Sequence, residues 1–443
     1  MIFGYTFFDP IIVLVFAAMA IYFLARNPVR LLAWLPTGLT VYFFIPLVTL
    51  LSIGQVLSLI LTARMMIRAR INAAPRFVPV LVLMLICFLV SASISFLAGQ
   101  DVTRTLLRAS YYIGLLAVFT FCFEMLRKER AYEIFVKGMA FLGIALMIYG
   151  LYQLFAVFAG LPLRGIVRGV YGAQIALEGG ILRINSFASE PKRLGYVMFV
   201  CALACFEWAR LKPKVSTKYK RFGYLVLGTS ALTFAGSYFI AIALFLLTIV
   251  VLYPSRATKL VFAGLAGVFI LSAVPETRLA EIAVNAYERR AQEVEVGLDG
   301  LKVYRQEFYA EDYLVNNPEA IIFGVGLGQY YGVLNAEYGP GVGYGEDGVS
   351  LAPLNSAMLE TLFDLSGVFV LLMYFALFYL IWRLRRMGEK FLCLALLFVV
   401  LQSFTIQSLT FVVMLAGVAS AKLVQRERNA NSRSMQVRFP VPS

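Results

Sequence analysis

The chain has 443 residues, of which 61% are apolar, 14% aromatic and 14% charged, and its formal net charge is +14. Soluble domains carry about 25% charged residues, so this composition excludes a soluble enzyme and a secreted disulfide scaffold. The absence of histidine excludes a histidine base or metal ligand. The sequence therefore predicts an all-α polytopic membrane protein, with residues 1–443 forming a single membrane-embedded domain.

Apolar runs long enough to cross a bilayer, about 20 residues each, follow one another along the chain. Single crossings are predicted at Asp9–Leu24, Phe77–Ala98, Ser110–Leu126, Gly138–Gly160, Leu194–Ala209, Leu260–Val274 and Asn355–Trp382. Three runs are longer, namely Leu31–Ala63, Gly223–Tyr253 and Phe391–Ala421. Basic residues flank Gly223–Tyr253 and Phe391–Ala421 at both ends, so each of these runs is predicted to form a helical hairpin, turning near Ala235–Gly236 and near Ser403–Thr405. The run Leu31–Ala63 could form either one helix or two. The total is about 12 or 13 crossings.

Basic residues gather in short loops, and the positive-inside rule places such loops in the cytoplasm. The basic segments are 64–76, 127–137, 210–221, 256–259, 383–390 and the tail 422–443. Residues 275–353 instead contain thirteen acids and five bases, a net charge of −8, which leaves +22 for the rest of the chain. We therefore interpret the basic charge as a topology signal and not as a nucleic-acid surface. Two outer, periplasmic segments are predicted, 161–193 and the large loop 275–354.

Within the large loop, the pattern predicts an amphipathic helix over Glu276–Val296 and a second helix over Leu301–Val315 that stops before Pro318. From Gly324 to Gly348, nine of 25 residues are glycine and four are tyrosine, which predicts a mobile loop without a core.

The first outer segment carries candidate binding and catalytic residues. Arg164 and Arg168 precede the run Arg183-Ile-Asn-Ser-Phe-Ala-Ser-Glu190-Pro-Lys192-Arg193. Arginine binds phosphate through two parallel hydrogen bonds, and a carboxylate such as Glu190 can accept a proton from a hydroxyl. The alternative is that these are interfacial residues at the start of the helix that follows.

A second constellation lies at the end of the large loop. Arg305 is followed by Pro318, by Gly-x-Gly-x-Gly from Gly324, and by Asn355-Ser356-x-x-x-Glu360 before Gly367. The glycine pattern lacks the βαβ context of a nucleotide loop. We expect Asn355 to cap the next helix. Ser356, Glu360 and Asp364 share one face of that helix and must face a wet cavity or a partner.

Taken together, the two constellations resemble a known family. The order R-x-x-S-x-x-x-E-P, then R…P…G-x-G-x-G and N-S-x-x-L-E in a late outer loop, is similar to the bacterial O-antigen polymerase and ligase superfamily (Wzy-type and WaaL-type membrane glycosyltransferases). Arg168…Gly179 and Arg289…Gly300 also match an R-x10-G spacing that occurs in polymerases of this family. The resemblance implies a GT-C-like architecture.

The chain departs from the family pattern at two positions, and the first departure favours the polymerase within that family. Ligases typically carry a histidine before the Asn-Ser step, where this chain has Leu354. An arginine usually follows the serine of the hairpin near the outer face, whereas here Ser237 is followed by Tyr238.

The resemblance implies a polymerase of the bacterial inner membrane, with its active site facing the periplasm. It would transfer a glycan from undecaprenyl pyrophosphate to a lipid-linked repeat unit, without a metal or other cofactor. Arg183 and Glu190 are the first catalytic candidates, and Glu360 is the second choice of base. The implied substrate-binding residues are Arg164, Arg168, Lys192, Arg193, Arg289, Arg305, Tyr330, Asn355 and Ser356.

The implied partners are undecaprenyl-pyrophosphate-linked oligosaccharides, membrane lipid and a chain-length regulator, with no nucleic acid. The alternatives are an O-antigen ligase and a flippase or secondary transporter of lipid-linked sugars.

Overall fold

The structure is a computed structural model of the whole chain. It describes residues 18, 22, 28–40, 53–67, 78–97, 102–128, 130–159, 176–178, 181–184, 186, 188, 191–233, 235–252, 306–339, 354, 356–405 and 408–438. The predicted helix over 276–296 and the predicted crossing at 260–274 lie outside these ranges, as does the predicted crossing at 9–24 except for residues 18 and 22. Six candidate site residues also lie outside them, namely Arg164, Arg168, Glu190, Arg289, Arg305 and Asn355.

The described residues are helical apart from one short hairpin. The helices of the first half are η1 (Pro28–Arg30), α2 (Leu31–Thr40), α3 (Ile53–Ile67), α4 (Val78–Leu97), α5 (Val102–Leu126), α6 (Ala131–Phe158), α7 (Pro191–Leu211), η3 (Pro213–Val215), α8 (Ser216–Ala231) and α9 (Gly236–Leu252). Those of the second half are α13 (Gln306–Asn316), α14 (Pro318–Phe323), α15 (Tyr330–Tyr338), α16 (Ala357–Leu365), α17 (Gly367–Arg386), α18 (Lys390–Gln402) and α19 (Thr410–Arg438). Strands β1 (Ala176–Glu178) and β2 (Ile181–Arg183) pair antiparallel, with Ala176 opposite Arg183.

Four of the described helices are long and apolar enough to cross a membrane. They are Val102–Leu126, Ala131–Ala156, Lys192–Leu211 and Gly367–Arg386, and three shorter apolar helices accompany them. Large hydrophobic side chains remain exposed on these helices, for example Leu116, Phe155 and Phe375 at 55%, 63% and 74%. Such surfaces are unfavourable in water and suit lipid. The architecture is therefore that of an α-helical membrane protein.

Two of the three long apolar runs break where the sequence predicts a turn. α8 ends at Ala231 and α9 starts at Gly236, so the turn lies at Leu232–Ala235. α18 ends at Gln402, and a turn over Ser403–Thr405 precedes α19. Both predicted breaks are confirmed. The open run at the N-terminal side contains two helices, α2 and α3.

The predicted crossing over Asn355–Trp382 starts later than expected, because the chain breaks at Ser366 and the helix that could cross a membrane is Gly367–Arg386. Ser366 has a φ of 102°, and its side chain accepts a hydrogen bond from the Phe369 N–H at 3.3 Å. It therefore caps α17 as a new helix instead of continuing α16. The expected cap at Asn355 is also off by one, since the N-cap of α16 is Ser356, whose hydroxyl accepts from the Leu359 N–H at 3.2 Å.

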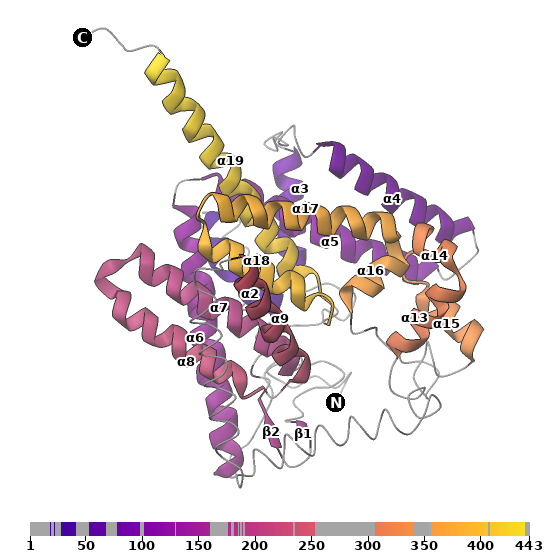
Figure 1. The fold of residues 1–443 in the computed structure, drawn as a ribbon, viewed down its shortest axis with the longest axis horizontal. Helices are drawn as coiled ribbons and strands as arrows, with labels where there is room; N and C mark the ends of the chain where they lie inside the picture. The colour runs from indigo at the N-terminus through magenta and orange to yellow at the C-terminus, as the bar shows by residue number, and fades with distance from the viewer. Residues whose placement is uncertain are drawn as a thin grey trace.

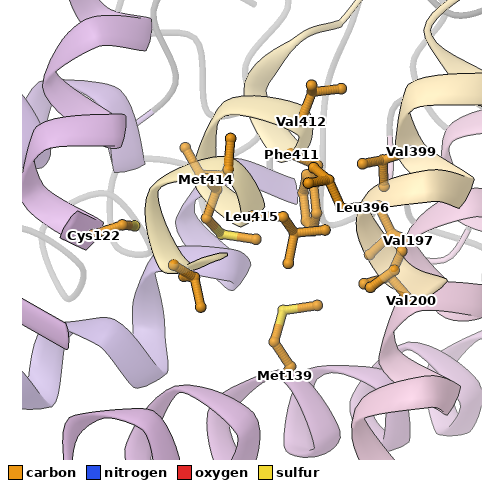
Figure 2. Close-up of a cluster of buried hydrophobic side chains, with 14 of the residues drawn as sticks. Cys122, Met139, Val197, Val200, Leu396, Val399, Phe411, Val412, Met414 and Leu415 are labelled. Atoms are coloured by element: carbon orange, nitrogen blue, oxygen red, sulfur yellow. The ribbon is translucent and has the colours of Figure 1, made fainter. Parts of the chain in front are cut away.

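The core lies where α6, α7, α18 and α19 meet. Figure 2 shows Met139 of α6 facing Val197 and Val200 of α7 and Leu396 and Val399 of α18. Next to them, the rings of Phe199 and Phe398 stack with centroids 4.0 Å apart. Figure 1 shows that α13, α14 and α15 gather at one edge of the molecule, beside α16 and the ends of α4, α5 and α17.

Candidate functional site

A buried arginine of α5 holds two carboxylates of α16. The Arg108 Nη2 lies 2.6 Å from Glu360 Oε2, and its Nε contacts Asp364 Oδ2. The guanidinium also lies over the rings of Tyr111 and Tyr112, with centroids 4.8 and 5.3 Å away. Only 8% of Arg108 is exposed. We call Arg108, Tyr112, Glu360 and Asp364 the Arg108 cluster.

Asp364 is the best-connected member of this cluster. One carboxylate oxygen accepts from the Arg108 Nε and from the Tyr112 hydroxyl at 2.8 Å, and the other accepts from the Gly328 N–H at 2.9 Å. Its backbone carbonyl accepts from the Ser91 hydroxyl of α4. The residue has no exposed surface. It therefore ties together α4, α5, α16 and the segment that contains Gly328.

The sequence places both carboxylates on one side of a short helix. Residues four apart lie on the same face of an α-helix, so Glu360 and Asp364 both point at α5. Glu360 lies in the first turn of α16, where the helix dipole favours a negative charge. Two members of the predicted polar stripe, Glu360 and Asp364, therefore face a partner, Arg108, whereas the third, Ser356, caps α16.

The glycine-rich segment after α14 packs tightly on this helix, so the prediction of a mobile loop is wrong for residues 324–339. Gly324, Gly326 and Gly328 all have positive φ angles of 74°, 106° and 69°. A Cβ on Gly326 would lie 2.5 Å from the Ser95 Oγ of α4. The Val325 N–H donates to the Phe363 carbonyl at 2.7 Å. Glycine is required here for close approach and for left-handed backbone, and not for mobility.

The tyrosines that follow belong to helix α15. The Tyr330 and Tyr331 rings stack with centroids 3.8 Å apart, and Arg104 lies 5.8 Å from the Tyr331 centroid. Tyr330 is 1% exposed, and burial raises the pKa of its phenol well above the usual value. Tyr330 therefore stays a neutral phenol beside the Arg108 cluster, and its predicted contact with substrate remains a prediction.

Both carboxylates of the Arg108 cluster contact the same guanidinium, and all three charged side chains are almost fully buried. Removing one partner of a buried ion pair is costly because the other charge is left without compensation. Ionisable residues inside membranes generally mark functional sites, which makes this cluster a candidate site.

The first motif block packs on different helices. Ser186 has a φ of 49°, and its N–H donates a hydrogen bond to Gln153 Oε1 of α6 at 2.8 Å. Its hydroxyl donates to the Leu146 carbonyl at 2.9 Å. Ile184 is fully buried and would contact a Cβ on Gly150. These contacts fix Ile184 and Ser186, which follow Arg183 at the end of β2. At the start of α7, Lys192 and Arg193 are half-buried.

Tyr238, which follows Ser237 in the hairpin, is a core residue. It is 1% exposed, and its hydroxyl lies 2.5 Å from the Ser230 Oγ across the α8–α9 turn. A Cβ on Gly195 of α7 would lie 2.9 Å from its ring. The side chain at this position therefore joins α7 to the hairpin.

Sequence reasoning missed Arg108 and Tyr112. The predicted crossing began at Ser110, and the two arginines before it, Arg104 and Arg108, belonged to none of the basic loops assigned to the cytoplasm. Their spacing of four residues at the start of an apolar run was the available signal. α5 in fact begins at Val102, which carries Arg108 into the helix.

Among the described residues, no three acidic or cysteine side chains gather into a metal site. No family model matches the chain, and no curated protein matches its sequence.

Proposed function

We propose that the protein is a membrane glycosyltransferase that polymerises a lipid-linked bacterial surface polysaccharide. The observation that carries the proposal is the packing of the Gly324–Gly328 segment on α16. The parts of the second motif block that carry the family resemblance are far apart in sequence, yet Gly328 binds Asp364 directly and Glu360 lies one turn away. A catalytic or binding site requires that its residues be held together in one rigid unit, and this motif block forms such a unit around buried charges.

The reaction would proceed as a displacement at the sugar anomeric carbon. The acceptor hydroxyl oxygen forms a bond to that carbon as the bond to the pyrophosphate oxygen breaks, and undecaprenyl pyrophosphate leaves. The acceptor proton passes to a carboxylate. Arg183 and the other outer arginines would neutralise the charge that grows on the pyrophosphate.

Two carboxylates compete for the role of base. Glu190 comes first because it lies seven residues from Arg183 in the same run. Glu360 supports the proposal through its place in the Arg108 cluster, although its ion pair with Arg108 must loosen before it can accept a proton. Comparing Glu190→Gln with Glu360→Gln decides between them, and we expect the larger loss for Glu190→Gln. A typical loss for removal of a general base is about 10²–10⁴-fold.

A transporter of lipid-linked sugars is the second candidate, because buried charges such as Arg108 and Asp364 also occur on the ion pathways of transporters. Deleting the gene and separating the host's surface polysaccharide on a gel distinguishes the two. Loss of the ladder with a single repeat still attached supports the polymerase. Loss of every repeat contradicts it and supports a transporter or a ligase.

A further inference from the structure

Helix α14 exposes a row of large apolar side chains. Ile321, Ile322 and Phe323 are consecutive and are 40%, 53% and 55% exposed, and we call them the α14 patch. On the inner side of the same helix, Ala320 is 4% exposed. Water-facing segments rarely expose three consecutive large hydrophobic residues without a partner. The sequence alone assigns this segment to a large outer loop, so something other than water must cover the patch.

The depth of the neighbouring helix α17 follows from its length and charge. α17 has 20 residues, Gly367–Arg386, and ends with Arg383, Arg385 and Arg386. At 1.5 Å per residue it spans roughly 30 Å, which is the thickness of the hydrocarbon core. Arginine is strongly disfavoured in that core. With the arginines at one boundary, Gly367 lies at the opposite boundary.

α14 is fixed to that end of α17 by backbone contacts. A Cβ on Gly367 would lie 2.5 Å from the Ile321 carbonyl oxygen, so the two backbones touch. The residues directly after α14 are held by the hydrogen bond from the Val325 N–H to the Phe363 carbonyl. On α17, Val368 and Leu371 are 43% and 72% exposed within the next turn. The α14 patch therefore lies at the bilayer boundary, beside side chains that face lipid.

The charge of this part of the chain narrows the kind of partner. Residues 306–338 contain five acids and no lysine or arginine. Such a segment gains nothing from anionic lipid headgroups or an acidic protein. Burial of apolar area is the remaining driving force, worth about 25 cal/mol per Å².

We propose that α14 inserts the α14 patch into the outer boundary of the bilayer, between acyl chains and headgroups, beside α17. Part of the predicted outer loop is then a membrane-contact element. This inference does not depend on the proposed reaction.

The test places a single tryptophan in the full-length protein. Trp34, Trp208 and Trp382, the three native tryptophans, are replaced by phenylalanine. Phe323→Trp and Ile322→Trp report on the patch, Phe375→Trp on the lipid-facing middle of α17, and Ala336→Trp on an exposed position of α15. Each variant is reconstituted in phosphatidylcholine vesicles whose acyl chains carry bromine near the headgroup or near the chain middle, and iodide is the aqueous quencher.

We expect Phe323→Trp and Ile322→Trp to be quenched most by the shallow bromines, Phe375→Trp by the deep ones, and Ala336→Trp by iodide. Adding phosphatidylglycerol leaves the depth at the patch unchanged. Equal iodide quenching at positions 323 and 336 overturns the inference, because the patch then faces water. Protection of both patch positions from all three quenchers also overturns it, because the patch is then covered by protein. Either patch variant alone suffices if the other does not reconstitute.

Discussion

Two groups of buried carboxylates differ in where their basic partners lie. In the Arg108 cluster, Glu360 and Asp364 share Arg108, which is 8% exposed. On α7, beside Tyr132, the Glu207 carboxylate is 6% exposed while the side chain of its partner Arg210 is 64% exposed. Glu389 shows the same asymmetry, with a side chain 7% exposed against 50% for Arg426.

The difference lies in how the positive charge reaches water. Arg210 and Arg426 extend along apolar surface to solvent, as long basic side chains do at membrane boundaries. Ion pairs of this kind contribute little to stability, typically about 0–1 kcal/mol. Arg108 has no such route, so its charge is balanced entirely within the protein. The Arg108 cluster is therefore where mutations should have large effects, and the Glu207–Arg210 pair is the matched control.

The largest effect is expected for Arg108→Ala. Two buried carboxylates would lose their shared partner, at a cost of about 3–5 kcal/mol. Arg108→Lys should recover part of the loss, because an ammonium is a point charge and cannot bind both carboxylates with a planar fork. The measurement is thermal unfolding of the purified protein in detergent. A melting temperature unchanged by Arg108→Ala would show that the cluster does not stabilise the fold.

Next in size is the contrast within the cluster. Asp364→Asn places an amide N–H₂ group among three donors, and we expect a loss of about 1.5–3 kcal/mol in unfolding free energy. Glu360→Gln should cost less unfolding free energy, because Arg108 keeps its contact with Asp364, and it should shorten the polysaccharide chains. Unfolding and ladder length are measured on the same preparations. Equal destabilisation by both substitutions would contradict the separate roles of the two carboxylates.

Gly326→Ala tests whether the glycine segment is packed or mobile. The added methyl group meets Ser95, and a φ of 106° disfavours any side chain, so we expect a loss of about 1–3 kcal/mol. Gly339→Ala is the matched control, because its φ is also positive, at 92°, but nothing lies within 4 Å. The difference between the two variants isolates the packing contribution. Equal losses would mean that only the backbone angle matters.

Arg210→Ala should have the smallest effect, below about 1 kcal/mol. Glu207 keeps a second partner, since the Tyr132 hydroxyl donates to its Oε1 at 2.9 Å. Urea or thermal unfolding beside Arg108→Ala provides the measurement. A loss of unfolding free energy comparable to that of Arg108→Ala would remove the distinction between the Glu207–Arg210 pair and the Arg108 cluster.

Hydrophobic periodicity and charge predicted the helical architecture and the two hairpin turns, because both depend on local composition. The break at Ser366 escaped prediction because the apolar run continues across it, and only the left-handed backbone at that residue separates α16 from α17. The glycine segment was misjudged for a related reason. Glycine permits both disorder and close packing, and only the neighbours Ser95 and Phe363 distinguish them.

Only part of the site could be predicted from the sequence. The spacing of Glu360 and Asp364 gave a polar face, but nothing local indicated which basic residue it meets. Arg108 lies 256 positions before Asp364 in the chain. A pairing of that range is set by how α4, α5 and α16 pack, and no pattern within either segment encodes it.

That distance along the chain has a consequence for biosynthesis. A ribosome adds about 5–20 residues per second, so α5 leaves it on the order of tens of seconds before α16 exists. During that interval Arg108 has neither Glu360 nor Asp364, and a lone charge favours the water boundary. The N-terminal turns of α5 must then stay near the membrane surface, and they reach their final position only after the second half of the protein is made. A truncated nascent chain ending before residue 357 should leave Arg108 reachable by water-soluble reagents, as an early stage of assembly.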